Sequence, residues 1–338
     1  MNLPTDKTLA STDKTLASTD KTQSTDKTQS TDKTQSTDKT QSTDKTQSTD
    51  KTLASTDKTL AQTTNIYIHA YRVIERLGKG CFSTVFKAAH RTNGRIVAIK
   101  VEPRHTTIKH ESQILAYLGR EISADMRWCV PTVHWYGTFG GNICLAMTFY
   151  SRPLTTTDDM LSTLDLCCQI VKAFRHIHTA GIIHCDVKPD NFMLDDRGRV
   201  VVIDFGFASL YRDFETGEHR PNIPSTHLIG SPKYASYFVH QGNRIGRRDD
   251  LISVGYLMMW LFGIEMEWST TFVGSSDLPV YDIHHSANVE RAKYKKPEKL
   301  LSYLSNHYLI LYFESVYNLE YDDDPDYNEY LRGFSTLY

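Results

Sequence analysis

The sequence lacks a long apolar run, a paired-cysteine motif and a strong net charge. Its longest apolar stretch, around Val254 to Phe262, is too short to span a bilayer. None of the six cysteines forms a C-x-x-C pair, which argues against a zinc site and a disulfide framework. Because the formal net charge is only -2, we expect no specific nucleic-acid partner. Met1 to Pro4 show no secretion signal, so we expect an intracellular protein, cytoplasmic or nuclear, without membrane insertion. We also expect it to be a monomer.

The N-terminal segment lacks the residues that a hydrophobic core requires. From Thr5 to Ala61 the chain repeats Thr-Asp-Lys-Thr followed by Leu-Ala-Ser or Gln-Ser, with no aromatic residue and almost nothing aliphatic. Such a segment cannot bury enough apolar surface to offset its ordering entropy, so residues 1–64 are predicted to be disordered. Each copy carries one Asp and one Lys, which argues against a basic arm for nucleic acid or membrane.

Further along the chain, one short loop carries an acid, a cation and an amide. Asp186, Lys188 and Asn191 lie two and three residues apart, and Asp204-Phe205-Gly206 follows about a dozen residues later. Phosphoryl transfer needs a carboxylate that orients the nucleophile, together with cations and metal ligands that neutralise charge. The triplet His184-Cys185-Asp186 or the triplet Asp204-Phe205-Gly206 alone could occur by chance in a loop. The presence of both in this order, with Lys188 and Asn191 between them, favours phosphoryl transfer.

This spacing resembles the catalytic and metal-binding loops of eukaryotic protein kinases. The resemblance implies that Asp186 meets the substrate hydroxyl and Lys188 the transferring phosphate. It also implies that Asn191 and Asp204 hold Mg²⁺, and that ATP is the phosphate donor.

A glycine-rich hairpin precedes this loop by about a hundred residues. An alternating stretch ending at Leu77 runs into Gly78 and Gly80, and Val85 follows. Glycines let backbone N–H groups approach phosphate oxygens, so these four residues are candidates for nucleotide binding. Ser83 stands where the kinase pattern has its third glycine. A glycine pair is also typical of an ordinary tight hairpin.

The next strand, Ile96 to Glu102, sets a lysine among apolar residues. Lys100 ends the sequence Val-Ala-Ile-Lys, which resembles the kinase strand whose lysine holds the α and β phosphates. Ala98 and Met147 are expected to contact the nucleotide as well. Met147, in the predicted strand Asn142 to Tyr150, is equally typical of plain core.

The lysine needs an acidic partner on the following helix. Thr107 is predicted to cap that helix, and the spacing of its apolar residues points Glu111 inward. Glu121 is the alternative partner. It follows Gly119, where we expect the helix to have ended.

A long helix is predicted from Leu161 to Thr179 beneath the catalytic loop. His176, His178 and His184 form a possible metal cluster. Nothing in the sequence supplies further ligands, so we expect hydrogen-bonded structural histidines instead.

Several stretches narrow the resemblance to the casein kinase 1 family. That resemblance implies an α+β, two-lobed kinase fold after the disordered segment, with a five-stranded antiparallel N-lobe containing one helix (65–150) and a mainly helical C-lobe (151–338). It also implies a Ser/Thr kinase whose protein substrates are acidic or phosphorylated upstream of the target. The stretches, which span about Tyr71 to Phe334, are Lys109-His110-Glu111-Ser112, Val187-Lys188-Pro189-Asp190-Asn191-Phe192, Leu210-Tyr211-Arg212-Asp213, Gly230-Ser231-Pro232-Lys233-Tyr234-Ala235-Ser236, Arg247-Arg248-Asp249-Asp250-Leu251 and Tyr321-Asp322-Asp323-Asp324-Pro325-Asp326-Tyr327.

In that family, basic residues near the activation segment hold the priming phosphate. Lys233 matches one such position, and a run of Arg291, Lys293, Lys295 and Lys296 resembles another. A charge run of this kind is also typical of a solvated face.

Two substitutions leave other functions open. Cys185 replaces the arginine of His-Arg-Asp, which in many kinases contacts a phosphorylated activation loop, so we expect no control by that route. With Ser83 it motivates a pseudokinase scaffold, an alternative opposed by the presence of Lys100 and Asp204. A small-molecule phosphotransferase is a further alternative, which Lys188 disfavours. Between Gly263 and Glu290 the sequence leaves the family pattern, and we predict no structure there.

Overall fold

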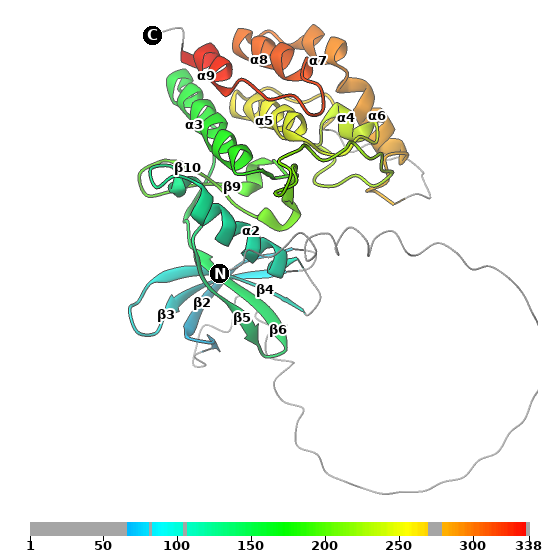
Figure 1. Cartoon of the computed structure of the whole chain (residues 1–338). Coiled ribbons are helices and arrows are strands. Elements are labelled where there is room, and N and C mark those ends of the chain that lie inside the picture. The colour runs from blue at the N-terminus through cyan, green and yellow to red at the C-terminus, as the bar shows by residue number, and fades with distance from the viewer. Residues whose placement is uncertain (1–65, 81–82, 104–106, 270–278, 336–338) are drawn as a thin grey trace, which may run out of the picture. The chain divides into compact units, whose positions relative to one another are not determined.

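The computed structural model describes residues 66–80, 83–103, 107–269 and 279–335 (Figure 1). The predicted disorder of residues 1–64 lies outside the described residues, as do Cys81 and Phe82 of the glycine-rich hairpin.

A curled antiparallel sheet with one helix makes up the N-terminal part of the described chain. The strand order is β1-β2-β3-β4-β6-β5. The sequence predicted five strands, and β1 is a sixth, too short for its period to be recognised. Ile68 of β1 is nevertheless buried and pairs with Tyr71. The strands are β1 (Tyr67–Ile68), β2 (Tyr71–Lys79), β3 (Thr84–His90), β4 (Ile96–Pro103), β5 (Val133–Phe139) and β6 (Asn142–Thr148).

Side chains alternate between the two faces of this sheet. One face carries the apolar cluster that includes Phe86, Ala88, Val97 and Ile99. The residues between these positions point to the other face. There Val85 pairs with Lys100, and Ala98 pairs with Met147. Register therefore places these four predicted nucleotide-binding residues on a single face.

Helix α2 (Ile108–Glu121) packs against β4, β5 and β6. Thr107 occupies the N-cap position, but its side chain makes no capping hydrogen bond. Glu102 Oε2 accepts from the Ile108 N–H instead, at 3.4 Å. The predicted N-cap position is therefore confirmed, but the capping hydrogen bond comes from another residue.

The predicted end of α2 at Gly119 is also wrong. The helix continues through Gly119 to Glu121, and the Ile122 N–H still donates to the Leu118 carbonyl. A glycine inside a helix lowers helix stability by about 1 kcal/mol relative to alanine. Burial of the Leu118 and Ile122 side chains offsets this cost.

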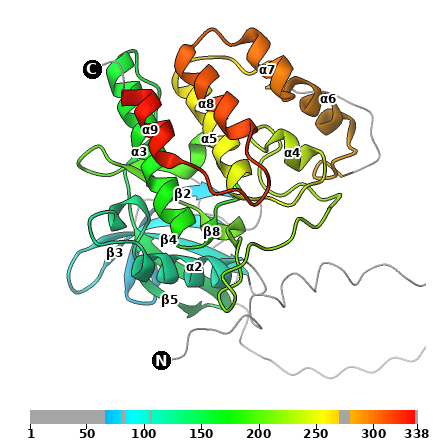
Figure 2. The same ribbon diagram turned by 45° about the horizontal axis from the view of Figure 1, so that its top comes forward.

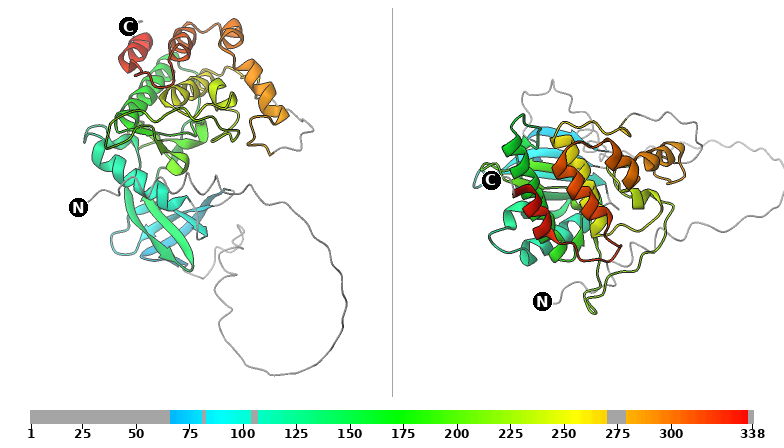
Figure 3. Two further views of the ribbon diagram at one scale, coloured as in Figure 1. Left: turned by 45° about the vertical axis from the view of Figure 1, so that its right-hand side comes forward. Right: turned by 90° about the horizontal axis from the view of Figure 1, so that it is seen from above.

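The C-terminal part is mainly helical and is built around α5 (Arg247–Leu261). Nearly every residue of α5 is buried, and α5 packs against α3 and α8 (Figures 2 and 3). The predicted Leu161–Thr179 helix is α3, which begins one residue earlier, after Asp159 as its N-cap. The other helices are α3 (Met160–Thr179), α4 (Tyr237–His240), α6 (Ser286–Tyr294), α7 (Pro297–Tyr303), α8 (His307–Tyr317) and α9 (Tyr327–Ser335).

Short strand pairs and 3-10 turns frame the loop that carries Asp186. Strand β8 pairs with β11, and β9 pairs with both β10 and β7, so the chain on each side of the loop is fixed by backbone hydrogen bonds. Within the described residues no helix is both long and apolar enough to cross a membrane. The remaining elements are β7 (Arg152–Pro153), β8 (Ile182–Ile183), β9 (Phe192–Leu194), β10 (Val200–Val202), β11 (Ser209–Leu210), η1 (Arg127–Cys129), η2 (Pro189–Asn191) and η3 (Phe205–Phe207).

Candidate active site

The loop between β8 and η2 is held from below by a buried carboxylate of α5. Asp250 Oδ2 accepts from the His184 N–H at 2.6 Å, and Oδ1 accepts from the Cys185 N–H at 2.9 Å. His178 Nε2 lies 3.0 Å from Asp250 Oδ2. Asp250 appeared in the sequence only within a family motif, and its role as the support of this loop was missed.

Cys185 has the left-handed φ of 66°, which is strained for a residue with a side chain. The Asp250 contact and an apolar cluster hold it there. In that cluster Cys185 packs with Leu228, Ala235 and Val239. Burial raises the pKa of its thiol well above the ordinary value. Cys185 therefore has a packing role: its apolar contacts connect the segment that begins at Leu228 to the loop that carries Asp186.

The carboxylate of Asp186 is surrounded by three donors. Lys188 Nζ lies 2.6 Å from Oδ2, and Asn191 Nδ2 lies 3.1 Å from the same oxygen. Ser231 Oγ donates to Oδ1 at 2.8 Å and also lies 3.2 Å from Lys188 Nζ. The loop thus brings together the acid, the cation and the amide predicted from spacing. It adds Ser231, which the sequence showed only as part of a family stretch.

A chain of ion pairs joins the sheet, α2 and the second predicted loop. Lys100 Nζ lies 2.8 Å from Glu111 Oε2 and 2.8 Å from Asp204 Oδ1. Glu111, not the alternative Glu121, is therefore the partner of the lysine. Asp204 adopts a left-handed φ of 61° at the start of η3, which turns its carboxylate back toward Lys100.

Two further contacts fix the second loop. His110 of α2 places Nε2 2.6 Å from the Ala208 carbonyl, and the Phe205 ring packs edge-on to His184 at 4.9 Å between centroids. The position of α2 is thereby coupled to that of Asp204. His110 belongs to a family stretch, although the sequence did not assign it a contact.

Burial and charge oppose each other in this cluster. Burial raises the pKa of Glu111 to about 7, and the adjacent Lys100 ammonium works against that rise. Burial also disfavours the charged form of Lys100, but attraction to Glu111 and Asp204 outweighs it and raises the lysine pKa. For Asp204, burial favours the neutral form, yet Lys100 prevails and lowers the pKa.

The raised pKa of Glu111 has a measurable consequence. We expect kcat/KM for ATP to increase as pH rises through about 7, because only the ionised carboxylate pairs with Lys100. Initial rates from about pH 5.5 to 8.5 test this. In Glu111→Gln the side chain does not titrate, so the residual activity should lose this limb. A limb with the same midpoint in the glutamine variant would assign it to another group.

The glycine-rich hairpin is described up to its tip. Gly78 pairs with Val85, and the Gly80 N–H donates to the Ser83 carbonyl at 2.8 Å. Leu77 is exposed beside this pair. A Cβ added at Gly78 would meet no heavy atom within 4 Å, so the glycine leaves open space at its position. This arrangement suits close approach of a polyphosphate to the backbone.

The residues present also fit a magnesium ion. Mg²⁺ takes oxygen ligands and commonly binds one or two carboxylates together with phosphate oxygens. Asp204 supplies a partly exposed carboxylate. Asn191 commits its Nδ2 to the main-chain and side-chain oxygens of Asp186, which leaves its amide oxygen for a cation.

Two of the three predicted histidines, His178 and His184, make hydrogen bonds of the structural kind expected. His178 lies between Asp250 and the Tyr327 hydroxyl, with Nδ1 2.6 Å from that oxygen. His184 Nε2 lies 3.1 Å from the Ile203 carbonyl, and its Nδ1 accepts from the Asp186 N–H. These contacts orient the catalytic loop.

The basic run predicted to bind phosphate does not form one surface. Lys295 is fully buried and donates to the carbonyls of Pro232 and Ala235, so it cannot meet a substrate phosphate. The prediction is wrong for this residue, because packing turns its side chain inward. Lys293 remains exposed, and Lys233 is half-buried beside the Tyr234 ring.

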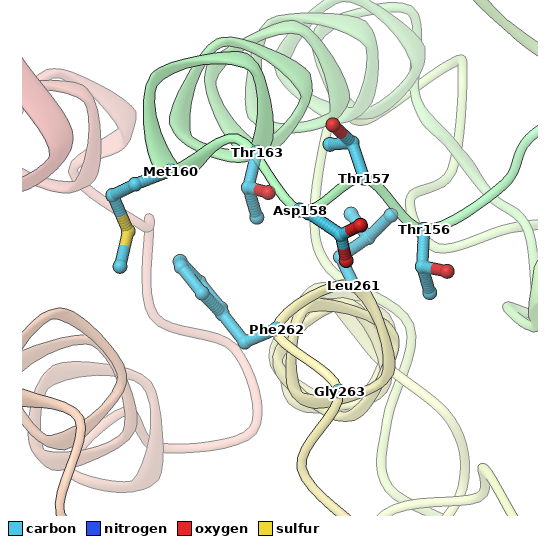
Figure 4. Close-up of a pocket in the computed structure, with 8 residues that line it drawn as sticks. All are labelled: Thr156, Thr157, Asp158, Met160, Thr163, Leu261, Phe262 and Gly263. Atoms are coloured by element: carbon cyan, nitrogen blue, oxygen red, sulfur yellow. The ribbon is translucent and has the colours of Figure 1, made fainter.

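A separate hollow lies where α3 begins and α5 ends. It measures about 340 Å³, and Figure 4 shows Phe262 reaching from the end of α5 toward Met160. None of the predicted site residues lines it, so it is distinct from the cluster around Asp186. Its lining residues are Thr156, Thr157, Asp158, Met160, Thr163, Leu261, Phe262 and Gly263.

A sheet lysine paired with a buried glutamate and a partly exposed aspartate, together with a loop carboxylate held by a lysine and an amide, defines a site of the phosphotransferase class. The family model described as protein kinase domain matches residues 71–306, which is well over half of the chain and includes every predicted site residue. The chain belongs to the protein kinase family and is a protein kinase.

Proposed function

We propose that this protein kinase is an active serine/threonine kinase of the casein kinase 1 type, dependent on ATP and Mg²⁺. The observation that carries the proposal is the arrangement of Lys188, Asn191 and Ser231 around the Asp186 carboxylate. Asp186 would orient and accept the proton of the substrate hydroxyl. Ser231 holds its segment directly against this carboxylate. A peptide bound along that segment would therefore pass close to Asp186, which favours a nucleophile on a short side chain such as serine or threonine.

The other roles follow from charge. Lys100 would contact the α and β phosphates, and Glu111 holds its ammonium in place. Asp204 and Asn191 would bind the Mg²⁺ that neutralises charge on the phosphates. Lys188 would contact the transferring phosphate. Leu77, Val85, Ala98 and Met147 would flank the adenine.

The two alternatives are weaker. A pseudokinase scaffold has no need for an assembled Lys100, Glu111 and Asp204 chain, and Cys185 alters only packing below the loop. A small-molecule kinase has no need for a segment fixed beside Asp186 through Ser231.

An assay with radiolabelled ATP tests the proposal. The acceptors are casein, an acidic serine peptide, the same peptide with tyrosine, and a panel of small hydroxylated metabolites, each with and without Mg²⁺. We expect Mg²⁺-dependent transfer to casein and the serine peptide. Transfer only to metabolites, only to tyrosine, or equal turnover in Asp204→Asn would contradict it.

We also propose that Lys233 contributes to recognition of acidic or phospho-primed substrates. Lys233→Glu is expected to lower kcat/KM for a phospho-primed peptide by about 10-fold or more, since a hydrogen bond to a charged group contributes about 1.5 to 3 kcal/mol. An unprimed peptide should lose far less. Lys172→Glu, at an exposed lysine on α3 outside the basic run, is the matched control. Equal losses on both peptides would count against a phosphate contact at Lys233.

A further inference from the structure

Four successive backbone carbonyls next to Ser231 accept hydrogen bonds from buried side chains. In chain order they belong to Pro232, Lys233, Tyr234 and Ala235. Lys295 Nζ donates to the first and the last of them, at 2.9 and 2.5 Å. Trp268 Nε1 donates to the second at 2.7 Å, and Ser253 Oγ donates to the third at 2.7 Å. The segment is therefore held by its main chain.

Lys295 is an unusual residue to find in this position. It is 0% exposed and follows the last turn of α6. Its Nζ lies 3.2 Å from His240 Nε2, and 5.1 and 5.4 Å from the ring centroids of Tyr256 and Trp268. Among the described residues no carboxylate lies within ion-pair distance of this Nζ. Its partners are two backbone carbonyls, an imidazole nitrogen and two aromatic faces.

The ionisable groups that act on Nζ are His240 and Arg291. Burial and the Lys295 ammonium lower the pKa of His240 well below its ordinary value, so the imidazole is neutral at physiological pH. Burial, and after it the charge of Arg291, lower the pKa of Lys295 well below its ordinary value. Burial of a lysine here is costly, and the hydrogen bonds from its Nζ to the two carbonyls offset part of that cost.

Those carbonyls are coupled to the candidate catalytic carboxylate. The N–H groups of Tyr234 and Ala235 donate to the Ser231 carbonyl, at 2.8 and 2.9 Å. Ser231 Oγ then donates to Asp186 and contacts Lys188. A shift of the segment would carry Ser231 away from Asp186.

We propose that Lys295 is a positioning residue for protein substrate: from inside the C-lobe it clamps the anchored segment, Ser231–Ser236, and so sets the path of a bound peptide relative to Asp186. This rests on the proposed role of Asp186 toward the substrate hydroxyl. The donors of the clamp are Ser253, Trp268 and Lys295, none of which lies on the preceding loop. We therefore expect the anchored segment to form without a phosphate on that loop, in agreement with the apolar surroundings of Cys185.

Steady-state kinetics of Lys295→Met test the clamp, because methionine keeps the length of the side chain and removes its charge and donors. We expect kcat/KM for a serine peptide to fall about 10- to 100-fold, the loss typical of a small misplacement near the chemistry. Affinity for a fluorescent ATP analogue should stay within about twofold, since no nucleotide-binding residue contacts Lys295. Lys172→Met, at an exposed lysine on α3 outside the basic run, should match wild type in both measurements.

Trp268→Phe and Ser253→Ala, combined, are a second route if Lys295→Met does not fold. They remove two donors to the same segment while keeping an aromatic ring and a small side chain in place. The same split between peptide and nucleotide is expected. Unchanged peptide kinetics, or peptide and nucleotide parameters that fall in parallel, would overturn the inference in either set of variants.

Wild-type enzyme treated with phosphatase supplies the last arm. It should keep its initial rate toward the peptide, and a large drop that preincubation with ATP restores would refute assembly without phosphate. A wild type inactive toward every peptide would instead refute the proposed function itself. The clamp alone fails if wild type is active and Lys295→Met is equally active.

Discussion

Replacing Asp186 with asparagine is expected to lower kcat for a protein substrate by about 10²- to 10⁴-fold without unfolding the domain. The amide has the same shape but is a far weaker base, and its nitrogen cannot accept from Lys188 or Ser231. Affinity for nucleotide should persist, because Lys100 and Asp204 form a separate ion-paired group. Asp204→Asn should lose at least as much activity, together with affinity for Mg²⁺.

Asp190→Asn is the matched control, since Asp190 is exposed on the same loop. It should retain wild-type turnover. Thermal melting of all three variants separates loss of chemistry from loss of fold. Turnover near the wild-type rate with Mg²⁺ and ATP in either the Asp186 or the Asp204 variant would show that its role is wrongly assigned.

The second large effect is on stability, at the support beneath the loop. Asp250→Ala is expected to lower the free energy of unfolding by about 3 to 5 kcal/mol, because the N–H groups of His184 and Cys185 and the imidazole of His178 lose a buried charged acceptor. The left-handed backbone at Cys185 would lose its main restraint as well.

Urea denaturation followed by tryptophan fluorescence measures this change. Asp165→Ala is the comparison, since Asp165 is an exposed acid on α3. Its free energy of unfolding should stay within about 0.5 kcal/mol of wild type. An Asp250 variant as stable as the Asp165 variant would mean that solvent or another acceptor replaces the carboxylate. Peptide turnover of the folded fraction should also fall, because the loop carries Asp186.

Local sequence was sufficient where one short stretch carries the chemistry. Asp186, Lys188 and Asn191 lie on one loop, so their spacing alone predicts that they meet. The pairing of Lys100 with Glu111 followed from helical periodicity, which points Glu111 at the sheet. Strand alternation likewise predicts which side of β4 carries Ala98 and Lys100.

Contacts between distant segments could not be predicted in this way. Ser231 is 45 residues from Asp186, and Asp250 is 66 residues from His184. No periodicity links such positions, and only the packing of α5 beneath the loop brings them together. The end of α2 was misplaced for a related reason: a glycine favours termination locally, while burial of Leu118 and Ile122 extends the helix.

The amino-acid sequence by itself determined the phosphotransfer chemistry, because that chemistry depends on residue types at fixed short spacings. Only the tertiary structure decided the fate of individual charges. Lys293 and Lys295 are alike in a basic run, yet one is exposed and the other is fully buried on the carbonyls of Pro232 and Ala235. A side chain's energy depends on the dielectric and the partners around it, and these are set by segments far away in the chain.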